Sequence, residues 1–475
     1  MSAAGRRALV VGGGLAGITA ALALAAQGRR VTLLETRPRL GGLAFSFRRE
    51  SEVGELTVDN GQHVYLRCCT AYRGLLDRIG GARLAPVQRR LDVPVVDAER
   101  GVLGRLTRSA LPVPLHLAGG LARYPHLTLG ERAAVARAAL ALRRLDPADP
   151  ALDELSFADW LRARRQSPAS IAGLWDLVGV ATLNARAEDV SLGLAAKVFR
   201  TGLLSTSDAA DIGVPMVPLG TLHDELAGAA LDRAGVRTLL ATRARALRAA
   251  PGGGWRLAVS TRPGQGDGHR PDQELDADIV VLAVPQQAAH RLLPPGSLPD
   301  ADRLLGIDSA PILNVHVIYD RPVLRLPFIA AVNSPIQWVF DRTGPAGLNA
   351  LPGARNGQYL VISQSAVTEE IQQPAEVLRK RYLPALTRLL PRAAEARLLD
   401  FFVTRERTAT FAPTPGVGRL RPGPVTGAPG LFLAGAWTAT GWPATMEGAV
   451  RSGLAAARAA AQGETTANRP AKEPA

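Results

Sequence analysis

The segment from Ala8 to Glu35 constrains the fold of this chain more than any other part of the sequence. It opens on an apolar run, Ala8-Leu9-Val10-Val11, of the kind that forms a parallel strand buried on both faces. Glycines with the spacing G-x-G-x-x-G follow, and residues 18–27 are rich in alanine and leucine, which favour a helix. A second apolar run over 31–34 ends at Glu35, 21 residues after Gly14. This order of strand, turn, helix, strand and acid predicts an α/β fold of the Rossmann type.

The residue types in this segment are those that a bound dinucleotide requires. Glycine at 12 permits a sharp turn, glycine at 14 lets a pyrophosphate approach the backbone, and glycine at 17 lets the helix pack closely on the strand. The helix start offers free N–H groups and the positive end of its dipole to the anion, and the acid stands where a ribose would bind. We therefore predict that the cofactor contacts in this segment are Gly12, Gly14, Leu15, Ala16, Gly17 and Glu35.

A targeting or membrane segment is the competing interpretation of the same residues. Residues 8–26 carry no charge and follow Arg6 and Arg7, and Ala23-Leu24-Ala25 resembles a signal-peptide cleavage site. Three consecutive glycines and an immediate return to a strand pattern are wrong for either, and cleavage would destroy the phosphate turn. We therefore expect the N-terminus as written to be that of the mature chain.

Composition indicates a folded globular protein and argues against nucleic-acid binding. Of the 475 residues, 47% are hydrophobic and 21% are charged, which suffices for two or three lobes with sizeable cores. The net charge is +14, but only three of the 56 basic residues are lysines, and no dense basic run is interleaved with aromatic residues. A diffuse basic surface of this kind suits anionic lipid headgroups better than nucleic acid.

Cysteine and histidine usage predicts neither a disulfide nor a metal site. Cys68 and Cys69 are the only cysteines and are adjacent, which is unfavourable for a disulfide and too few for structural zinc. Seven scattered histidines show no metal-binding spacing. We expect the two cysteines to be small packing residues with free thiols in a reducing compartment.

A second glycine pair follows the acid. Residues 36–46 read T-R-P-R-L-G-G-L-A-F-S, which resembles the R-x-G-G-R-x-x-S/T element of the amine oxidase and phytoene desaturase flavoprotein superfamily. Arg39, both glycines and Ser46 match, whereas Leu43 replaces the usual arginine and removes one charge from the phosphate side. A plain surface turn is the alternative. The resemblance implies that FAD is the cofactor and that its ribose and pyrophosphate lie along Thr36, Arg37, Gly41, Gly42 and Leu43.

The sequence D-N-G-Q-H at 59–63 narrows the resemblance. It follows a short predicted strand over 56–58 and is similar to the squalene-associated flavoproteins, the hydroxysqualene dehydroxylases. Small and polar residues at this point suit a loop folded against a ring system, so Gly61, Gln62 and His63 are predicted to contact the cofactor. His63 is also a candidate proton donor by position, although a lone histidine is commonly a satisfied loop residue.

Residues 86–204 have the pattern of a helical cap. Thr128 and Glu131 form a capping box for a helix running to about residue 145, and Ser167-Pro168 begins a second helical segment that continues as an apolar helix over 171–183. Leu183-Asn184 again resembles the dehydroxylase group. The arginines of the first helix fit a membrane-surface helix or a solvated one.

Residues 205–290 return to the pattern of the dinucleotide lobe. A helix over 221–234 leads to a strand over 236–240, and the superfamily resemblance places an adenine contact near Ala244. A buried strand over 277–285 ends in V-P, and residues 264–272 read as a polar hairpin end. From 286 to 411, strands over 312–319, 337–341 and 358–363 predict a half-polar sheet, which would suit the floor of a long apolar pocket or a sheet packed for stability alone.

The C-terminal segment carries the other strong motif. A buried strand over 431–435 precedes G-W-P-A-T-M-E-G-A-V at 441–450, which resembles the last motif of the superfamily, where a helix start faces the flavin pyrimidine. Ala436 stands where the superfamily normally has an aspartate, which predicts weaker FAD affinity, a compensating water or a degenerate member. The resemblance assigns cofactor contacts to Gly435, Ala436, Thr445, Met446 and Ala449.

Together these patterns predict a Rossmann-like FAD-binding domain with a discontinuous α+β substrate domain. We assign 1–85, 205–290 and 412–463 to the FAD domain, 86–204 to the helical cap, 291–411 to the sheet-containing part and 464–475 to a disordered tail. The resemblance implies reduction of hydroxysqualene to squalene: the allylic C–O bond ionises in an apolar pocket and reduced flavin donates hydride.

Two other functions stay open at this stage. An isoprenoid desaturase would move hydride in the opposite direction, and a lipid-binding protein that has lost flavin would fit the changes at Leu43 and Ala436. The preferred reaction implies peripheral contact with the inner face of the plasma membrane from the cytoplasm. It also implies association with prenyl transferases of the squalene pathway, with no nucleic-acid partner.

Overall fold

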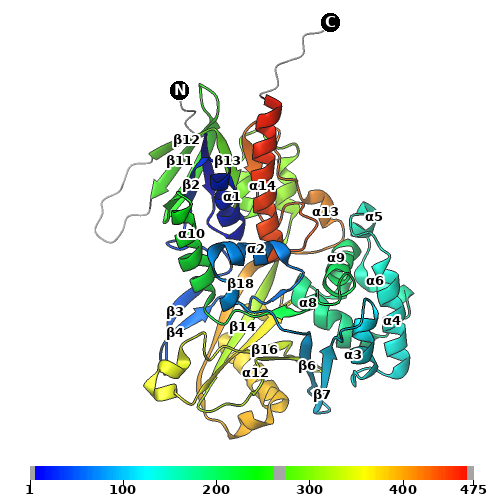
Figure 1. Ribbon diagram of the computed structural model, residues 1–475. Helices are drawn as coiled ribbons and strands as arrows, with labels where there is room; N and C mark the ends of the chain where they lie inside the picture. The colour runs from blue at the N-terminus through cyan, green and yellow to red at the C-terminus, as the bar shows by residue number, and fades with distance from the viewer. Residues whose placement is uncertain (1–5, 262–272, 468–475) are drawn as a thin grey trace.

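The computed structural model describes residues 6–261 and 273–467. Five parallel strands form one sheet in the order β19-β13-β1-β2-β9 (Figure 1). Each of the three sequence segments assigned to the FAD domain supplies at least one of them. The strands are β1 (Arg7–Val11), β2 (Arg30–Leu34), β9 (Arg237–Leu239), β13 (Ile279–Leu282) and β19 (Leu431–Leu433).

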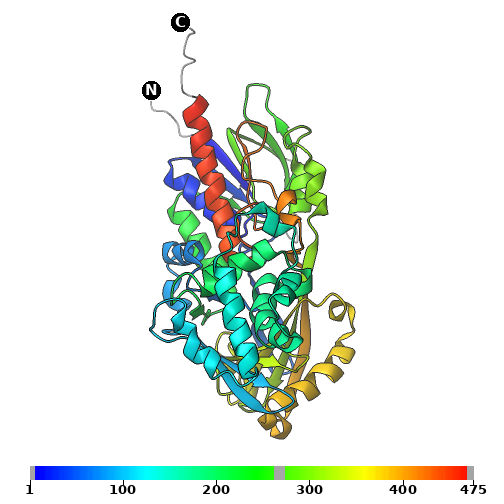
Figure 2. The same cartoon turned by 90° about the vertical axis from the view of Figure 1, so that its right-hand side faces the viewer.

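Both faces of this sheet are covered, which explains its apolar strands. On one face, helices α1 (Leu15–Ala26) and α14 (Met446–Ala467) pack side by side (Figures 1 and 2). They approach so closely that a Cβ built at Gly453 would overlap the carbonyl of Ala16. Helices α2 (Thr70–Ile79) and α10 (Ala227–Arg233) extend this layer. The other face packs against an antiparallel sheet of β10 (Thr242–Ala249), β11 (Trp255–Thr261) and β12 (Gln273–Ala277).

A second sheet of seven strands lies below the first in Figure 1, in the order β18-β14-β17-β16-β15-β6-β7. Side chains alternate across it. One face carries Leu313, Val315 and Val317, which pack against helix α12 (Ala375–Leu389). The strands are β6 (Asp92–Asp97), β7 (Val102–Thr107), β14 (Ser309–Tyr319), β15 (Phe328–Val332), β16 (Trp338–Asp341), β17 (Gln358–Ser365) and β18 (Leu398–Phe411).

The opposite face of the large sheet turns toward the dinucleotide lobe and the helical cap. A hairpin of β3 (Ser46–Ser51) and β4 (Gly54–Asp59) packs on it through Leu56 and Val58. Farther along, Phe328 and Phe340 belong to the same buried cluster as the aromatic residues of the cap. Because β4 ends at this junction, the loop that follows it lies between the two sheets.

The cap consists of short helices grouped beside the large sheet (Figure 2). The capping box at Thr128 is present, and the Ser167 hydroxyl accepts from the backbone N–H of Ser170. The predicted apolar helix begins as a π-helical turn over Ile171–Trp175 and continues as α8 (Asp176–Leu183). The main cap helices are α3 (Ala118–Ala122), α4 (Leu129–Arg143), α5 (Pro150–Asp153), α6 (Phe157–Ala163), α8 (Asp176–Leu183) and α9 (Leu192–Leu203).

Two expectations are wrong. Residues 92–107 are strands of the large sheet and not part of a helical cap, because the half-apolar hairpin of β6 and β7 finds a strand partner in β15. The tail predicted from 464 is helical as far as Ala467, because α14 continues with helix-compatible residues. The predicted hairpin end at 264–272 and residues 468–475 lie outside the described residues. Within the described ranges, no helix combines the length and hydropathy needed to cross a bilayer.

Candidate active site

The glycine turn after β1 has the geometry that the sequence predicts. A Cβ at Gly12, where φ is +112°, would overlap the Ala283 carbonyl, and one at Gly17 would overlap the Gly12 carbonyl. Both positions therefore exclude a side chain for reasons internal to the fold. At Gly14, by contrast, the nearest atom to a built Cβ is the Cα of Gly42 at 3.7 Å. The open side of the turn is thus at Gly14, where the pyrophosphate contact is predicted.

The second glycine pair packs directly on this turn. The backbone N–H of Gly41 donates to the Gly13 carbonyl at 2.9 Å, and a Cβ at Gly42, where φ is +59°, would lie 2.8 Å from the Cα of Gly14. Arg39 closes the loop from within, because its guanidinium donates to the carbonyls of Leu40 and Gly42 and stacks over Phe45. The plain surface turn considered as an alternative does not describe this arrangement.

Glu35 directly follows β2 and lies beside the glycine turn. Its carboxylate accepts from the backbone N–H of Gly13 at 2.7 Å and of Arg37 at 2.8 Å. Its own carbonyl accepts from the N–H of Thr242, which brings the strand carrying Ala244 alongside. We call the glycine turn, the Gly41-Gly42 pair and Glu35 together the cofactor cradle. The predicted ribose and adenine contacts therefore lie at one edge of this cradle. The Arg37 side chain is exposed, so the interaction within the loop is made by its backbone.

The loop after β4 is fastened to the second glycine segment. The Asn60 side chain donates to the Leu43 carbonyl at 2.6 Å and accepts from the N–H of Phe45 at 3.1 Å. His63 also hydrogen-bonds the Leu43 backbone, and burial lowers the pKa of His63 to about 4. The imidazole is therefore neutral at pH 7. Leu43 itself is 44% exposed, so the position of the missing arginine faces outward.

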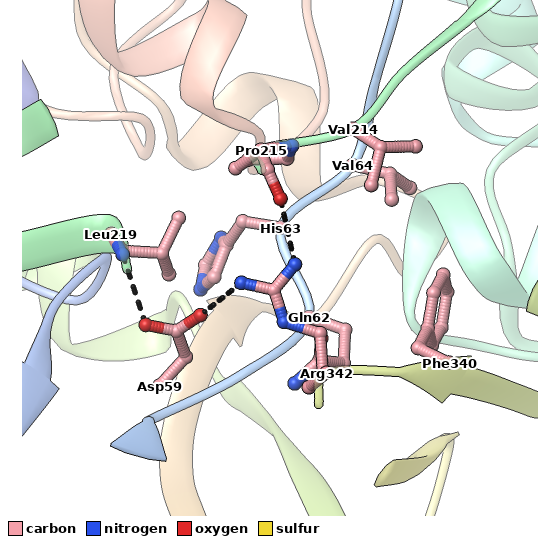
Figure 3. A pocket seen from close by; sticks show the side chains of 9 residues that line it. All are labelled: Asp59, Gln62, His63, Val64, Val214, Pro215, Leu219, Phe340 and Arg342. Carbon is pink, nitrogen blue, oxygen red and sulfur yellow. Dashed lines mark hydrogen bonds and ion pairs between the residues drawn. The ribbon is translucent and has the colours of Figure 1, made fainter. Parts of the chain in front are cut away.

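Beside His63 lies a buried ion pair that the sequence did not reveal. Arg342 donates to the Asp59 carboxylate at 2.8 Å and to the Pro215 carbonyl at 2.7 Å (Figure 3). Asp59 also accepts from the backbone N–H of Leu219. The pair joins three segments distant in sequence around a small pocket that Gln62 and His63 also line. Because Arg342 is one of many arginines, its sequence context carries no signal.

The C-terminal motif is organised by a second buried arginine. Arg421 donates to the carbonyls of Ala436, Trp437, Thr438 and Trp442, and so holds the loop before α14. Burial lowers the pKa of Arg421 to about 10, against the opposing effect of the Asp153 carboxylate. The loop that lacks the superfamily aspartate is thus held through its backbone. Nothing in the sequence around Arg421 distinguishes it from other arginines.

The start of α14 is tied to the rest of the site. Buried Glu447 accepts from the backbone N–H groups of Ala71 and Tyr72 and thereby caps α2, and Trp437 donates to the Val284 carbonyl at 2.9 Å. These contacts place the predicted helix-start residues in the same lobe as the glycine turn, and they leave three of them half-buried: Thr445, Met446 and Ala449. Gly435 excludes a side chain because a Cβ there would overlap the Trp437 ring.

The site residues therefore fit a flavin nucleotide. Glycines line an open turn at the start of α1, and buried arginines hold the surrounding loops without occupying that turn. Within the described residues, no cluster of histidine, cysteine or carboxylate side chains could hold a metal ion.

Comparison with known proteins identifies the family. The family model of flavin containing amine oxidoreductases matches residues 15–461. The chain belongs to this family. The predicted flavoprotein fold and a flavin-dependent oxidoreductase are thereby confirmed.

Three relatives resemble this family member over most of its length. It is 28% identical to a hydroxysqualene dehydroxylase of Sinorhizobium fredii, over 94% of this chain and 96% of that protein. It is 29% identical to a hydroxysqualene dehydroxylase of Rhodopseudomonas palustris, with the same coverage. It is 30% identical to a carotenoid phi-ring synthase of Streptomyces griseus, over 95% of this chain and 86% of that one.

Solved structures share the fold at low sequence identity. An oxidoreductase of Methanosarcina mazei superimposes with a TM-score of 0.70 at 15% identity, covering 94% of this chain and 99% of that one. The cyclohexylamine oxidase of Brevibacterium oxydans gives 0.68 at 19% identity, covering 97% of this chain and 100% of that one.

Proposed function

We propose that this protein is an FAD-dependent hydroxysqualene dehydroxylase that reduces hydroxysqualene to squalene. The observation that carries the proposal is its similarity, along nearly the full length of both chains, to three proteins with that name. Zeta-carotene desaturases are also similar, but at 22–24% identity.

The extent of the cradle supports FAD over a mononucleotide flavin. It runs from Glu35 and Ala244, where a ribose and adenine would lie, past Gly14 and Gly42 to the start of α14. A mononucleotide would leave Glu35 and Ala244 without a ligand. The close approach of Gly14 and Gly42 suits a pyrophosphate, which needs backbone N–H groups and no side chain.

The face of the large sheet supports a long apolar substrate. Phe328, Trp338 and Phe340 lie together on the face that turns toward the cap, and Trp338 is half-buried, so part of this face is open to a ligand. Apolar walls of this kind exclude water from a reacting carbon. When bound, reduced flavin supplies the hydride that replaces the hydroxyl group.

Departure of the hydroxyl group as water requires a proton. His63 lies beside this face and remains the candidate. Because burial lowers the pKa of His63 to about 4, its protonated form is more acidic than an ordinary imidazolium and is scarce at pH 7. A rate that rises as the pH falls toward 4 and does so less in His63→Gln would support His63 as the donor.

Anaerobic stopped-flow mixing of photoreduced enzyme with hydroxysqualene tests the proposal. We expect reoxidation of flavin together with formation of one squalene per flavin, and no reoxidation with squalene itself. Absence of substrate-dependent reoxidation would refute the function. Reduction of the oxidised enzyme by squalene or a polyene would instead identify a desaturase.

We also propose that the protein contacts the cytoplasmic face of the plasma membrane and associates with squalene-pathway prenyl transferases. Exposed Leu111 and Leu115, at 53% and 54%, lie on the segment that leads to exposed Arg123, and the net charge of +14 favours anionic lipid. Sedimentation with anionic vesicles should fall in Leu111→Ser/Leu115→Ser. The matched control is Leu305→Ser, which alters an equally exposed leucine in the segment Ala301–Gly306. Equal binding of both variants would contradict the contact.

A further inference from the structure

A buried carboxamide on β14, an inner strand of the large sheet, has an acceptor that the protein leaves unsatisfied. Asn314 on β14 is 0% exposed. Its Nδ2 donates to the Asn60 carbonyl at 3.1 Å, but its Oδ1 is buried and has no hydrogen-bond partner among the described residues. Buried side-chain acceptors without partners are rare in native proteins because they lose their hydration without replacement.

The orientation of this carboxamide follows from its one hydrogen bond. The group facing Asn60 must be a donor, because the Asn60 atom is a carbonyl oxygen. Rotating the amide by half a turn would bring two acceptors together and would leave a donor in place of the free oxygen. The side chain is therefore anchored by its nitrogen, and its oxygen is directed away from Asn60.

The neighbours of the Asn314 residue belong to two parts of the candidate site. Asn60 precedes Gly61, and a Cβ built at Gly61 would lie 3.2 Å from the His63 ring and 3.9 Å from Asn314 Nδ2. On the sheet, Asn314 pairs with Ser363 on β17 and Thr404 on β18, and both are only half-buried. Asn314 thus lies between the loop predicted to contact the cofactor and a partly open region of the sheet face.

We infer that Asn314 Oδ1 accepts a hydrogen bond from a ligand bound at this junction. The ligand must present an N–H or O–H group, because an amide oxygen cannot donate. Two sources have that chemistry: the ring N–H that flavin gains on reduction, and the hydroxyl group of the isoprenoid alcohol. The second source rests on the proposed function. In the first case Asn314 distinguishes reduced flavin, which carries the donor, from oxidised flavin, which lacks it. In the second case it distinguishes the isoprenoid alcohol from the product without the hydroxyl group.

The two sources predict different measurements on the flavin-loaded protein. A bond to reduced flavin stabilises only the reduced form, so Asn314→Leu should lower the midpoint potential. A tenfold loss in the preference of the protein for reduced over oxidised flavin corresponds to a shift of about 30 mV for a two-electron couple. If the bond is to the alcohol, Asn314→Leu should leave the midpoint potential unchanged. The variant should instead lose about tenfold of the preference for hydroxysqualene over squalene, measured as the ratio of their Kd values for the oxidised protein.

The chain offers a matched control. Gln364 on β17 is a buried carboxamide on the opposite face of the same sheet, bonded to Tyr382 and to the N–H of Gln337. Gln364→Leu should cost stability and leave both ligand measurements at their wild-type values. Asn314→Ala removes the same oxygen without adding a branched side chain and serves where Asn314→Leu does not fold.

A change in either measurement, in the Asn314 variant and not in Gln364→Leu, supports the inference and names the source. If flavin-loaded Asn314 variants match Gln364→Leu in both, the oxygen serves no ligand and the inference is overturned. Absence of hydroxysqualene-dependent flavin reoxidation in the wild-type protein would contradict the proposed function instead. The midpoint potential would then decide the role of Asn314 alone.

Discussion

Loss of the Arg342 charge should destabilise the protein far more than loss of an ordinary surface arginine. Arg342 is 6% exposed, and its guanidinium is bonded to the Asp59 carboxylate and to the carbonyls of Pro215 and Val217. In Arg342→Met the carboxylate would remain buried with only the Ser46 hydroxyl and the Leu219 N–H as partners. Removing one member of a buried pair typically costs about 3–5 kcal/mol, because a charge is left without compensation. We expect that loss here.

A double-mutant cycle separates the pair from its neighbours. Asp59→Asn keeps an oxygen for Ser46 and Leu219 but leaves the guanidinium without a counter-charge, so it should also be strongly destabilising. Asp59→Asn/Arg342→Met removes both charges and should therefore be at least about 2 kcal/mol more stable than the sum of the single losses predicts.

Urea unfolding at pH 7, followed by tryptophan fluorescence at one fixed flavin concentration, measures these free energies. Arg392→Met is the control, because Arg392 is exposed. The interpretation of the pair would be refuted by a loss of less than about 1 kcal/mol in Arg342→Met, or by single losses that simply add in the double variant.

Three further predictions concern the cradle, the C-terminal loop and pH. Gly14→Ala should fold, because the nearest atom to the added Cβ is 3.7 Å away, but it should purify with little flavin. The control variant Gly74→Ala should retain its flavin. Equal absorbance near 450 nm in both variants would contradict a pyrophosphate contact at Gly14. Arg421→Met should lower the free energy of unfolding by at least about 3 kcal/mol in thermal or urea unfolding, because several buried carbonyls lose their donor. Arg421→Lys should have a stability between that of Arg421→Met and the wild type. A melting curve of Arg421→Met that matches the wild type would disprove this role of Arg421. Burial and the nearby Arg49 charge lower the pKa of His316 to about 3, below its unfolded value of about 6.5, so protons favour the unfolded chain and stability falls as the pH drops from 6.5 toward 3. His316→Gln should reduce that slope by about 1.4 kcal/mol per pH unit, and an unchanged slope in urea titrations would contradict a neutral buried His316.

Local patterns predicted much of the fold. Residues 8–35 form the predicted strand, helix and strand, and the capping box at Thr128 is present with both of its hydrogen bonds. These elements were predictable because glycine spacing, caps and apolar periodicity act between residues close in sequence. The hairpin of β6 and β7 was missed because its identity depends on β15, more than 200 residues away.

By itself the sequence predicted two positions at which the chain cannot carry a side chain. The glycines at 12 and 17 are required by the turn and by the close approach of helix and strand, and their spacing is visible in the sequence. Only the tertiary structure decided which polar groups serve the site. Arg342, Arg421 and Asn314 acquire their roles from partners brought together by the meeting of the two sheets. The physical reason is that a charge or an amide is unremarkable in water and becomes decisive only where folding removes the water and fixes its partners.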